Sequence, residues 1–156
     1  MIIGISEGDR YRFTVAFGAV LVAGKTALLP PNDLPHTVAQ LRAELSDMGC
    51  LYDEALPEGS RLPHLNVPRE AADAEAVRHM PEIAGDHLAA IVYTSGSTGK
   101  PTAHRKTWGK LCQNARAESR ALGVAGWSLA ATVPPQHMYG FESSVLLALQ
   151  GGAALW

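Results

Sequence analysis

Short apolar runs and longer segments of helical periodicity alternate along the first part of the chain. Residues 1–5, 26–29 and 50–52 are short runs of apolar and β-branched side chains, which are typical of buried strands. A helix that is apolar on most sides is predicted between the first two runs. Asp9 can cap its beginning, and Gly24 can end it.

One apolar stripe makes the next helical segment the clearest pattern in the chain. Its members recur at spacings of four, three, four and three residues, as one face of an α-helix requires: Leu34, Val38, Leu41, Leu45 and Met48. Asn32 or Asp33 can cap the start of this helix, and Gly49 can end it. We therefore expect a helix with a single apolar face over this segment.

Residues 54–86 show no clear period. Prolines interrupt the stretch repeatedly, and a short surface helix over residues 70–79 is the one element that its pattern suggests. We expect a loop-rich excursion over residues 54–86.

The alternation returns in the second half of the chain. It predicts a strand over 88–93, a loop of small residues over 94–101, a helix over 108–122, a strand over 129–133, a loop over 134–140, a helix over 141–149 and the start of a strand over 153–156. Strands and helices in alternation imply an α/β fold, with a mainly parallel sheet flanked by helices.

Composition and charge narrow the class of protein. Hydrophobic residues make up 47% and charged residues 18%, and the net charge is −2, which gives no general attraction to nucleic acid or to an anionic membrane. The longest apolar run, residues 15–24, is shorter than the roughly 20 residues that span a bilayer. Cys50 and Cys112 match no metal-binding spacing, which favours two buried free thiols. We expect a cytoplasmic protein with no nucleic-acid or membrane partner.

The loop over residues 94–101 carries the clearest chemistry. It reads Thr-Ser-Gly-Ser-Thr-Gly-Lys-Pro and follows a predicted buried strand. Its glycines let backbone N–H groups approach an anion, its hydroxyls add small donors, and Lys100 adds a cation. The alternative is an ordinary polar connection, but the pattern favours a site for nucleotide phosphates. The P-loop pattern fails here, because Thr94 and Pro101 stand at two of its fixed positions.

A rival motif lies near the start of the chain. Residues 4–8 match Gly-x-Ser-x-Gly between a predicted strand and a helix, which is the context of a hydrolase nucleophile elbow with Ser6 as nucleophile. Asp86 and His137 follow in a workable order. The strand before Ser6 is the first element, however, so no earlier loop supplies the usual oxyanion donor. A serine hydrolase is therefore the weaker alternative.

Three segments resemble one known superfamily, the adenylate-forming enzymes. Residues 93–101 are similar to the signature loop of acyl-CoA synthetases, acyl-carrier-protein ligases, luciferases and the adenylation domains of peptide synthetases. Residues 134–141, followed by a predicted helix and Gly151-Gly152-Ala153, resemble the His-x-x-Gly segment of that family. Residues 17–30 resemble, more weakly, a segment found upstream of the loop.

The resemblance implies an ATP-dependent ligase. Such an enzyme uses ATP and Mg²⁺ to convert a small carboxylic acid into an acyl adenylate, and then transfers the acyl group to a thiol of CoA or of a phosphopantetheinyl acyl carrier protein. Thr94 would help to hold the metal, and His137 would be the catalytic residue beside the reacting groups. Tyr139 and Phe141 would line the acid pocket, although core packing is the equal alternative for each. The phosphate-binding residues implied are Thr94, Ser95, Gly96, Ser97, Thr98, Gly99 and Lys100.

The chain departs from the family pattern just after the loop. The family usually has lysine and then glycine after the proline, where this chain has Thr102 and Ala103, with His104-Arg105-Lys106 just beyond. Three interpretations stay open. Lys100 replaces the missing charge, the basic cluster of residues 104–106 replaces it, or the loop is catalytically weaker.

Members of this family are several times longer than 156 residues. We therefore expect residues 1–156 to be a partial AMP-binding domain, truncated at the C-terminal end and also at the N-terminal end. By itself this chain is expected to bind nucleotide phosphates weakly without full catalysis. The alternative from another class is a non-catalytic binding or assembly module, which would form a homodimer through an open sheet edge.

Overall fold

A six-stranded sheet forms the centre of the protein. The computed structural model describes residues 2–4, 9–31, 35–45, 47–52, 63–68, 80–94 and 101–156. Within them the strand order is β4-β3-β1-β2-β5-β6, and all neighbouring pairs are parallel except β5 and β6, which are antiparallel. The expected mainly parallel sheet is therefore confirmed. The strands are β1 (Ile2–Gly4), β2 (Ala27–Leu29), β3 (Cys50–Tyr52), β4 (His64–Asn66), β5 (Leu88–Thr94) and β6 (Thr102–Thr107).

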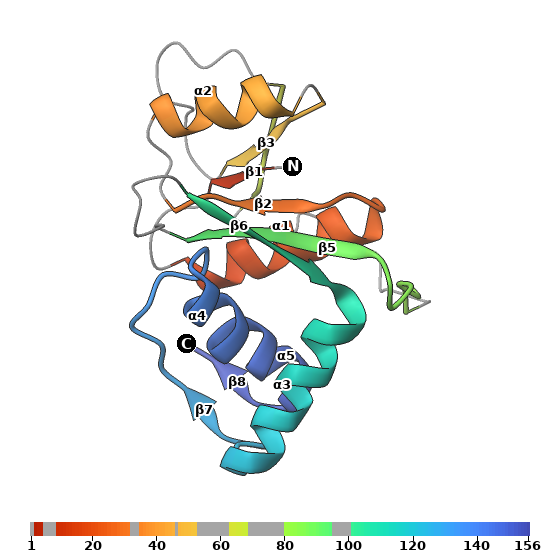
Figure 1. The fold of residues 1–156 in the computed structure, drawn as a ribbon. Coiled ribbons are helices and arrows are strands. Elements are labelled where there is room, and N and C mark those ends of the chain that lie inside the picture. Colours follow the sequence, from red (N-terminus) through yellow and green to blue (C-terminus); the bar gives the residue numbers. More distant parts are fainter. Residues whose placement is uncertain are drawn as a thin grey trace.

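Helices cover both faces of this sheet (Figure 1). One face carries α2 (Pro35–Glu44), and the other carries α1 (Arg10–Val22), α3 (Trp108–Leu122) and a C-terminal helical segment. That segment runs without a break through α4 (Met138–Gly140), a π-helical turn η1 (Phe141–Leu146) and α5 (Leu147–Gly151). A separate parallel pair joins β7 (Ser128–Leu129) to β8 (Ala154–Leu155). None of the helices in the described part of the chain is long and apolar enough to cross a membrane.

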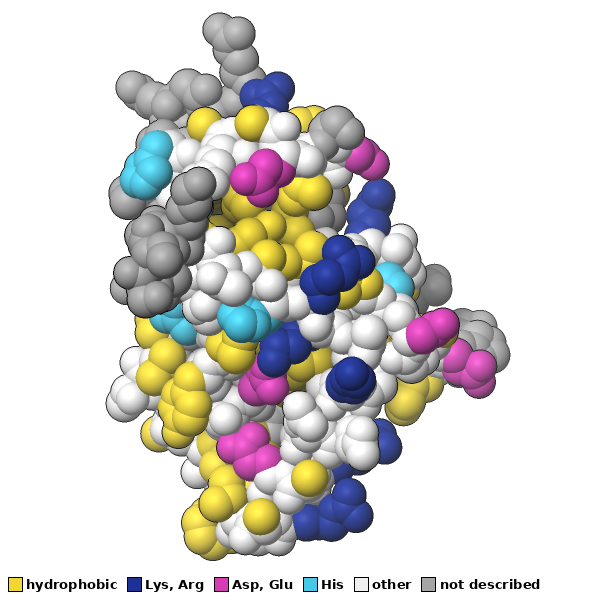
Figure 2. Space-filling view, viewed as in Figure 1, with side chains coloured by type: hydrophobic (Ala, Val, Ile, Leu, Met, Phe, Trp, Pro, Cys, Tyr) yellow, Lys and Arg dark blue, Asp and Glu magenta, His cyan; other side chains and the backbone are white. Residues whose placement is uncertain are grey.

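Alternate strand residues enter two different apolar clusters, because successive side chains of a strand point to opposite faces. Ala90 and Val92 of β5 are buried in the larger cluster, together with side chains of α1, α3 and η1. Ile91 and Tyr93 pack instead against the smaller cluster, which includes Leu41 of α2. Apolar side chains on this second side remain visible at the surface between α2 and β6 (Figure 2).

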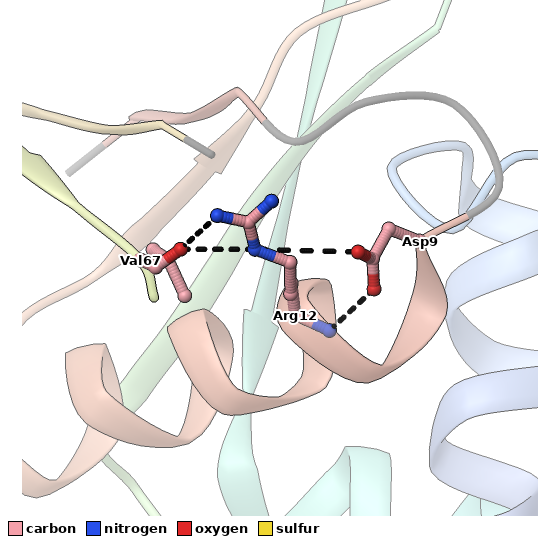
Figure 3. Close-up of polar contacts among 3 residues, drawn as sticks. All are labelled: Asp9, Arg12 and Val67. Atoms are coloured by element: carbon pink, nitrogen blue, oxygen red, sulfur yellow. Dashed lines mark hydrogen bonds and ion pairs between the residues drawn. The ribbon is translucent and has the colours of Figure 1, made fainter. Parts of the chain in front are cut away.

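A buried arginine ties α1 to the segment that follows β4 (Figure 3). Arg12 is only 5% exposed, and its Nε and Nη2 atoms both donate to the backbone carbonyl oxygen of Val67, Nε at 2.9 Å. Asp9 caps the helix as predicted, since its carboxylate accepts a hydrogen bond of 3.0 Å from the backbone N–H of Arg12. The same carboxylate lies 4.0 Å from the Arg12 Nε atom. The guanidinium therefore links the helix start to a strand end far away in the sequence.

Several predicted boundaries agree closely with the structure. The first helix begins after Asp9, and Gly24 follows it with a positive φ of 65°. The helix over 108–122 has the expected bounds, and the C-terminal helix ends at Gly151 and is followed by Gly152, whose φ is 73°. In the stripe helix, α2 stops at Glu44 and Met48 lies beyond it, although Met48 still packs in the same cluster as Leu41. Its expected caps, residues 32 and 33, lie outside the described residues.

Two strands escape prediction, and two elements have shifted bounds. β4 lies inside the stretch expected to be loop-rich, and β6 lies between the small-residue loop and α3. Both are edge strands with mostly exposed side chains, so neither shows an apolar run or a clear alternation. β7 covers 128–129 rather than 129–133, and the C-terminal helical segment begins at Met138 rather than 141. The surface helix expected over 70–79 lies outside the described residues.

Both cysteines are free thiols, as expected. Cys50 is buried in β3, and burial raises its pKa to about 11. Cys112 is only partly buried on α3, so the expectation of burial holds for Cys50 alone. Partial burial also raises the pKa of Cys112. Both side chains are therefore neutral thiols near pH 7.

Candidate functional site

Thr94 is the last residue of β5, at the strand's carboxyl end. The rest of the predicted phosphate loop, residues 95–100, lies outside the described residues. That loop joins β5 to β6, which are antiparallel and pair Thr94 with Thr102. The residues flanking the loop are therefore held at adjacent positions of one sheet edge.

Strand register decides which side chains share a face with Thr94. Thr94 follows Val92 by two residues, so it lies on the face of the larger cluster. Across the antiparallel pair, Thr102, His104 and Lys106 stand opposite Thr94, Val92 and Ala90. Directly opposed residues of such a pair point to the same side. The three residues on β6 therefore form a polar row on the face of Thr94.

Because of this register, the three residues of the basic cluster, 104–106, do not all lie on the same face of the sheet. His104 lies beside Thr94, with 3.1 Å between its Nε2 atom and the Thr94 Oγ1 atom. Lys106 forms an ion pair with Glu142 of η1, at 2.6 Å between Nζ and Oε1. Arg105 stands opposite Ile91 and so lies on the other face. Figure 2 shows histidine, basic and acidic side chains gathered between β6 and α4.

His137 lies immediately before α4, which packs beside β5. Its backbone N–H donates to the carbonyl of Pro134 at 3.1 Å, and its own carbonyl accepts from the N–H of Phe141 at 2.7 Å. Met138, the next residue, packs against the larger cluster. The helix that begins after His137 is thus on the same face of the sheet as Thr94 (Figure 1).

Tyr139 and Phe141 take different positions. Tyr139 is 70% exposed, so it is not a core residue and remains a candidate for contact with a substrate. Phe141 is fully buried and meets the ring of Phe17 edge-on, with centroids 4.9 Å apart, and that of Phe13 at 6.2 Å. Of the two roles left open for Phe141, its burial and ring contacts agree with core packing.

The packing around Gly140 shows why the last position of the His-x-x-Gly segment is a glycine. A Cβ atom on this residue would lie 2.1 Å from the carbonyl oxygen of Pro134 and 2.8 Å from that of Val133. The close approach lets α4 pack directly on the turn that precedes it. Ser144 adds to this packing, because its hydroxyl donates to the carbonyl of Gly140.

The described residues alone do not form a metal centre. No group of three or more His, Cys, Asp or Glu side chains is placed to bind an ion within the described part of the chain. Mg²⁺ usually keeps several waters and binds through one or two protein groups together with substrate phosphates. A hydroxyl oxygen such as that of Thr94, at the edge of a loop rich in N–H and O–H donors, fits that kind of site.

The residues next to this edge are in a partly apolar setting. Tyr93 packs under α2, and burial, with a smaller contribution from nearby Glu44, raises the pKa of its phenol.

A large cavity of about 790 Å³ lies away from this edge, between α1 and α5. It is lined by Tyr11, Leu149 and Trp156 among others, and by none of the predicted site residues.

The ion pair between Lys106 and Glu142 is expected to stabilise the site. The two side chains are only 23% and 20% exposed, so water and salt screen the pair less than a surface pair. A double-mutant cycle with Lys106→Met and Glu142→Gln should give a coupling free energy of about 1 kcal/mol by chemical denaturation. The exposed contact of Gln40 with Glu44, 3.5 Å apart on α2, is the matched control and should give less than about 0.5 kcal/mol. Equal coupling in both cycles would contradict the prediction.

Comparisons with known proteins point to one family. A family model described as AMP-binding enzyme matches residues 7–156. The chain is 30% identical to chondramide synthase cmdD of Chondromyces crocatus over 99% of its own length, and 34% identical to a 4-coumarate–CoA ligase of Halorhodospira halophila over 60%. It spans only 4% and 25% of those two proteins.

Two solved structures with a similar fold are coenzyme A ligases. An o-succinylbenzoate coenzyme A synthetase of Bacillus subtilis, in complex with ATP and magnesium ion, matches with a TM-score of 0.71 and 23% identity. A malonyl-CoA ligase with methylmalonyl-CoA and AMP bound matches with a TM-score of 0.77 and 24% identity. Each alignment covers 99% of this chain, and 43% and 34% of the respective neighbour. At these identities the likeness concerns the fold.

Proposed function

Because the chain belongs to the AMP-binding enzyme family, we propose that the protein is an ATP-dependent ligase that converts a carboxylic acid into an acyl adenylate and pyrophosphate. The acyl group then passes to the thiol of CoA or of a phosphopantetheinyl acyl carrier protein. One observation carries the proposal beyond family membership. Thr94, the first residue of the signature loop, ends β5 on the face of the sheet where α4 packs, and His137 stands immediately before α4.

The site residues would share the work of nucleotide binding. The phosphate loop, Thr94 to Lys100, would hold the β and γ phosphates of ATP through backbone N–H groups and hydroxyls. Negative charge grows on the transferring phosphate during attack by the acid, so fixed donors lower the barrier. Mg²⁺ held partly by Thr94 would add positive charge at the same place. His137 would donate a hydrogen bond to a phosphate oxygen or orient the acid.

For the acid substrate and for the thiol that accepts the acyl group, only the chemical class is proposed. Tyr139 is exposed beside His137 and would contact the acid. The relatives include a 4-coumarate–CoA ligase and a nonribosomal peptide synthetase, so both a free coenzyme and a carrier domain are acceptors consistent with this family. We also propose that residues 1–156 by themselves bind nucleotide phosphates without full catalysis. Robust exchange of pyrophosphate into ATP by that chain alone would contradict this.

The function is tested by acid-dependent exchange of labelled pyrophosphate into ATP. The enzyme is the product of the complete gene, and the acids are a panel of small aliphatic, aromatic and amino acids. We expect exchange with at least one acid, and we expect Thr94→Val to lower its rate about a hundredfold through loss of one well-placed oxygen. No exchange with any acid of the panel would instead favour a non-catalytic binding module.

Thr107→Val is the matched control for this experiment. Thr107 lies at the opposite end of β6, and its side chain makes no capping hydrogen bond to α3. This control should change the exchange rate less than about twofold, as is usual away from a site. Equal losses in the Thr94 and Thr107 variants would contradict the role of Thr94.

A further inference from the structure

The position that usually carries a lysine in this family lies on the face of Thr94. Thr102 occupies that position, and it stands directly opposite Thr94 in the β5–β6 pair. A threonine brings no charge, so the side chains that lie near Thr94 in the structure decide what this edge can offer to an anion or a cation. The inference below rests on the proposed function, because it concerns how the same edge binds a nucleotide.

Only one member of the basic cluster is in contact with Thr94 in the described structure. Lys106 is held by Glu142 at 2.6 Å, and Arg105 lies on the face toward α2. His104 stands on the correct face, and its Nε2 atom is 3.1 Å from the Thr94 Oγ1 atom. His104 is therefore the member of the basic cluster that contacts the hydroxyl of Thr94.

A hydrogen bond to a histidine can fix the direction of a hydroxyl group. Threonine Oγ1 carries one hydrogen and two lone pairs, and the hydrogen rotates to suit its partner. When the O–H donates to an unprotonated ring nitrogen, both lone pairs point elsewhere. An oxygen that binds a cation needs this arrangement, and residues that orient a metal ligand typically change metal affinity or activity by 10- to 100-fold when mutated.

We propose that His104 is a positioning residue, which accepts the Thr94 hydroxyl hydrogen and so turns an oxygen lone pair toward the Mg²⁺–phosphate group of a bound nucleotide. His104 thus acts through Thr94. The geometry that supports this is the 3.1 Å contact together with the register that puts both residues on one face. The role differs from that of a lysine, which would contact the phosphate directly as a charge.

The test measures equilibrium binding of ATP by titration calorimetry, at several Mg²⁺ concentrations, with the product of the complete gene. The variants are His104→Leu, Thr94→Val, the double variant, and His104→Gln, whose amide oxygen can accept the same hydrogen bond. Arg105→Leu is the matched control, since it removes a neighbouring cation from the opposite face. Thermal unfolding of each variant shows whether the fold is kept.

Binding by the wild-type protein tests the proposed function, and the variants test the role of His104. We expect His104→Leu to weaken Mg²⁺-dependent ATP binding about tenfold and to raise the Mg²⁺ concentration that gives half-maximal binding. The double variant should bind no more weakly than Thr94→Val alone, because the two residues act through one oxygen. His104→Gln should recover most of the affinity, and Arg105→Leu should change it less than about twofold.

Three results would overturn the inference. Additive losses in the double variant would mean that His104 contacts the nucleotide directly. Unchanged binding in His104→Leu, beside normal wild-type binding, would reject the role of His104 and leave the proposed function standing. If the wild-type protein bound no ATP at any Mg²⁺ concentration, both the proposed function and this inference would fail.

Discussion

Gly140→Ala is expected to destabilise the protein by about 3 kcal/mol or more and to abolish most acid activation, because the added methyl group has no space. Its Cβ atom would lie 2.1 Å from the carbonyl oxygen of Pro134. That oxygen belongs to the backbone and cannot move aside as the end of a flexible side chain can. The turn would have to shift, and His137 stands in it. Chemical denaturation and pyrophosphate exchange measure the two effects.

Gly18→Ala is the matched control for this substitution. Gly18 also lies within a helix, α1, and nothing comes within 4 Å of the Cβ atom that alanine would add. Alanine loses less backbone entropy than glycine on folding, so this variant should gain about 0.5–1 kcal/mol of stability and keep its activity. If Gly140→Ala were as stable and as active as Gly18→Ala, the close packing of α4 on the turn would be disproved.

Arg12→Met is expected to lower the free energy of unfolding by about 2–3 kcal/mol, because it removes the charged donor of a buried hydrogen bond. Methionine can fill much of the space of the arginine stem. It cannot replace the two N–H groups that reach the Val67 carbonyl, nor the charge near Asp9. The carbonyl would then be left buried with fewer donors. The loss should appear as a lower denaturant midpoint with an unchanged slope.

Two further arginine variants separate burial from charge. Arg116→Met changes an exposed residue of α3 and should alter stability by less than about 0.5 kcal/mol. Arg12→Lys keeps the charge but not the forked donor geometry, so its loss should fall between those of Arg116→Met and Arg12→Met. A loss in Arg12→Met no larger than that in Arg116→Met would show that the contact with Val67 contributes little.

Local signals account for the parts of the fold that the sequence predicts well. The first helix begins at a side-chain cap and ends at a glycine of positive φ, and both features act within one turn of the chain. The edge strands β4 and β6 carry no such signal, because their exposed side chains do not alternate. They are strands because a neighbouring strand supplies their hydrogen bonds.

In the candidate site, too, some features are visible in the sequence and others only in the structure. Composition and order of residues 94–101 predict phosphate chemistry, and residues 134–141 predict the histidine segment, since glycines, hydroxyls and caps are visible in the sequence itself. The difference between Tyr139 and Phe141 is not visible there. One is 70% exposed and the other fully buried, although both are aromatic and lie two residues apart.

The sequence by itself determined the family, the loop that would bind phosphates and the helices whose ends carry their own caps. Tertiary structure alone decided that His104 meets Thr94, that Lys106 pairs with Glu142 and that Arg12 is buried against Val67. The physical reason is the separation along the sequence over which each kind of interaction acts. Caps and periodicity act between residues a few positions apart, whereas these contacts depend on strand register and on the packing of helices against the sheet. Register and packing bring together residues of separate elements, 10 positions apart for Thr94 and His104 and 55 for Arg12 and Val67.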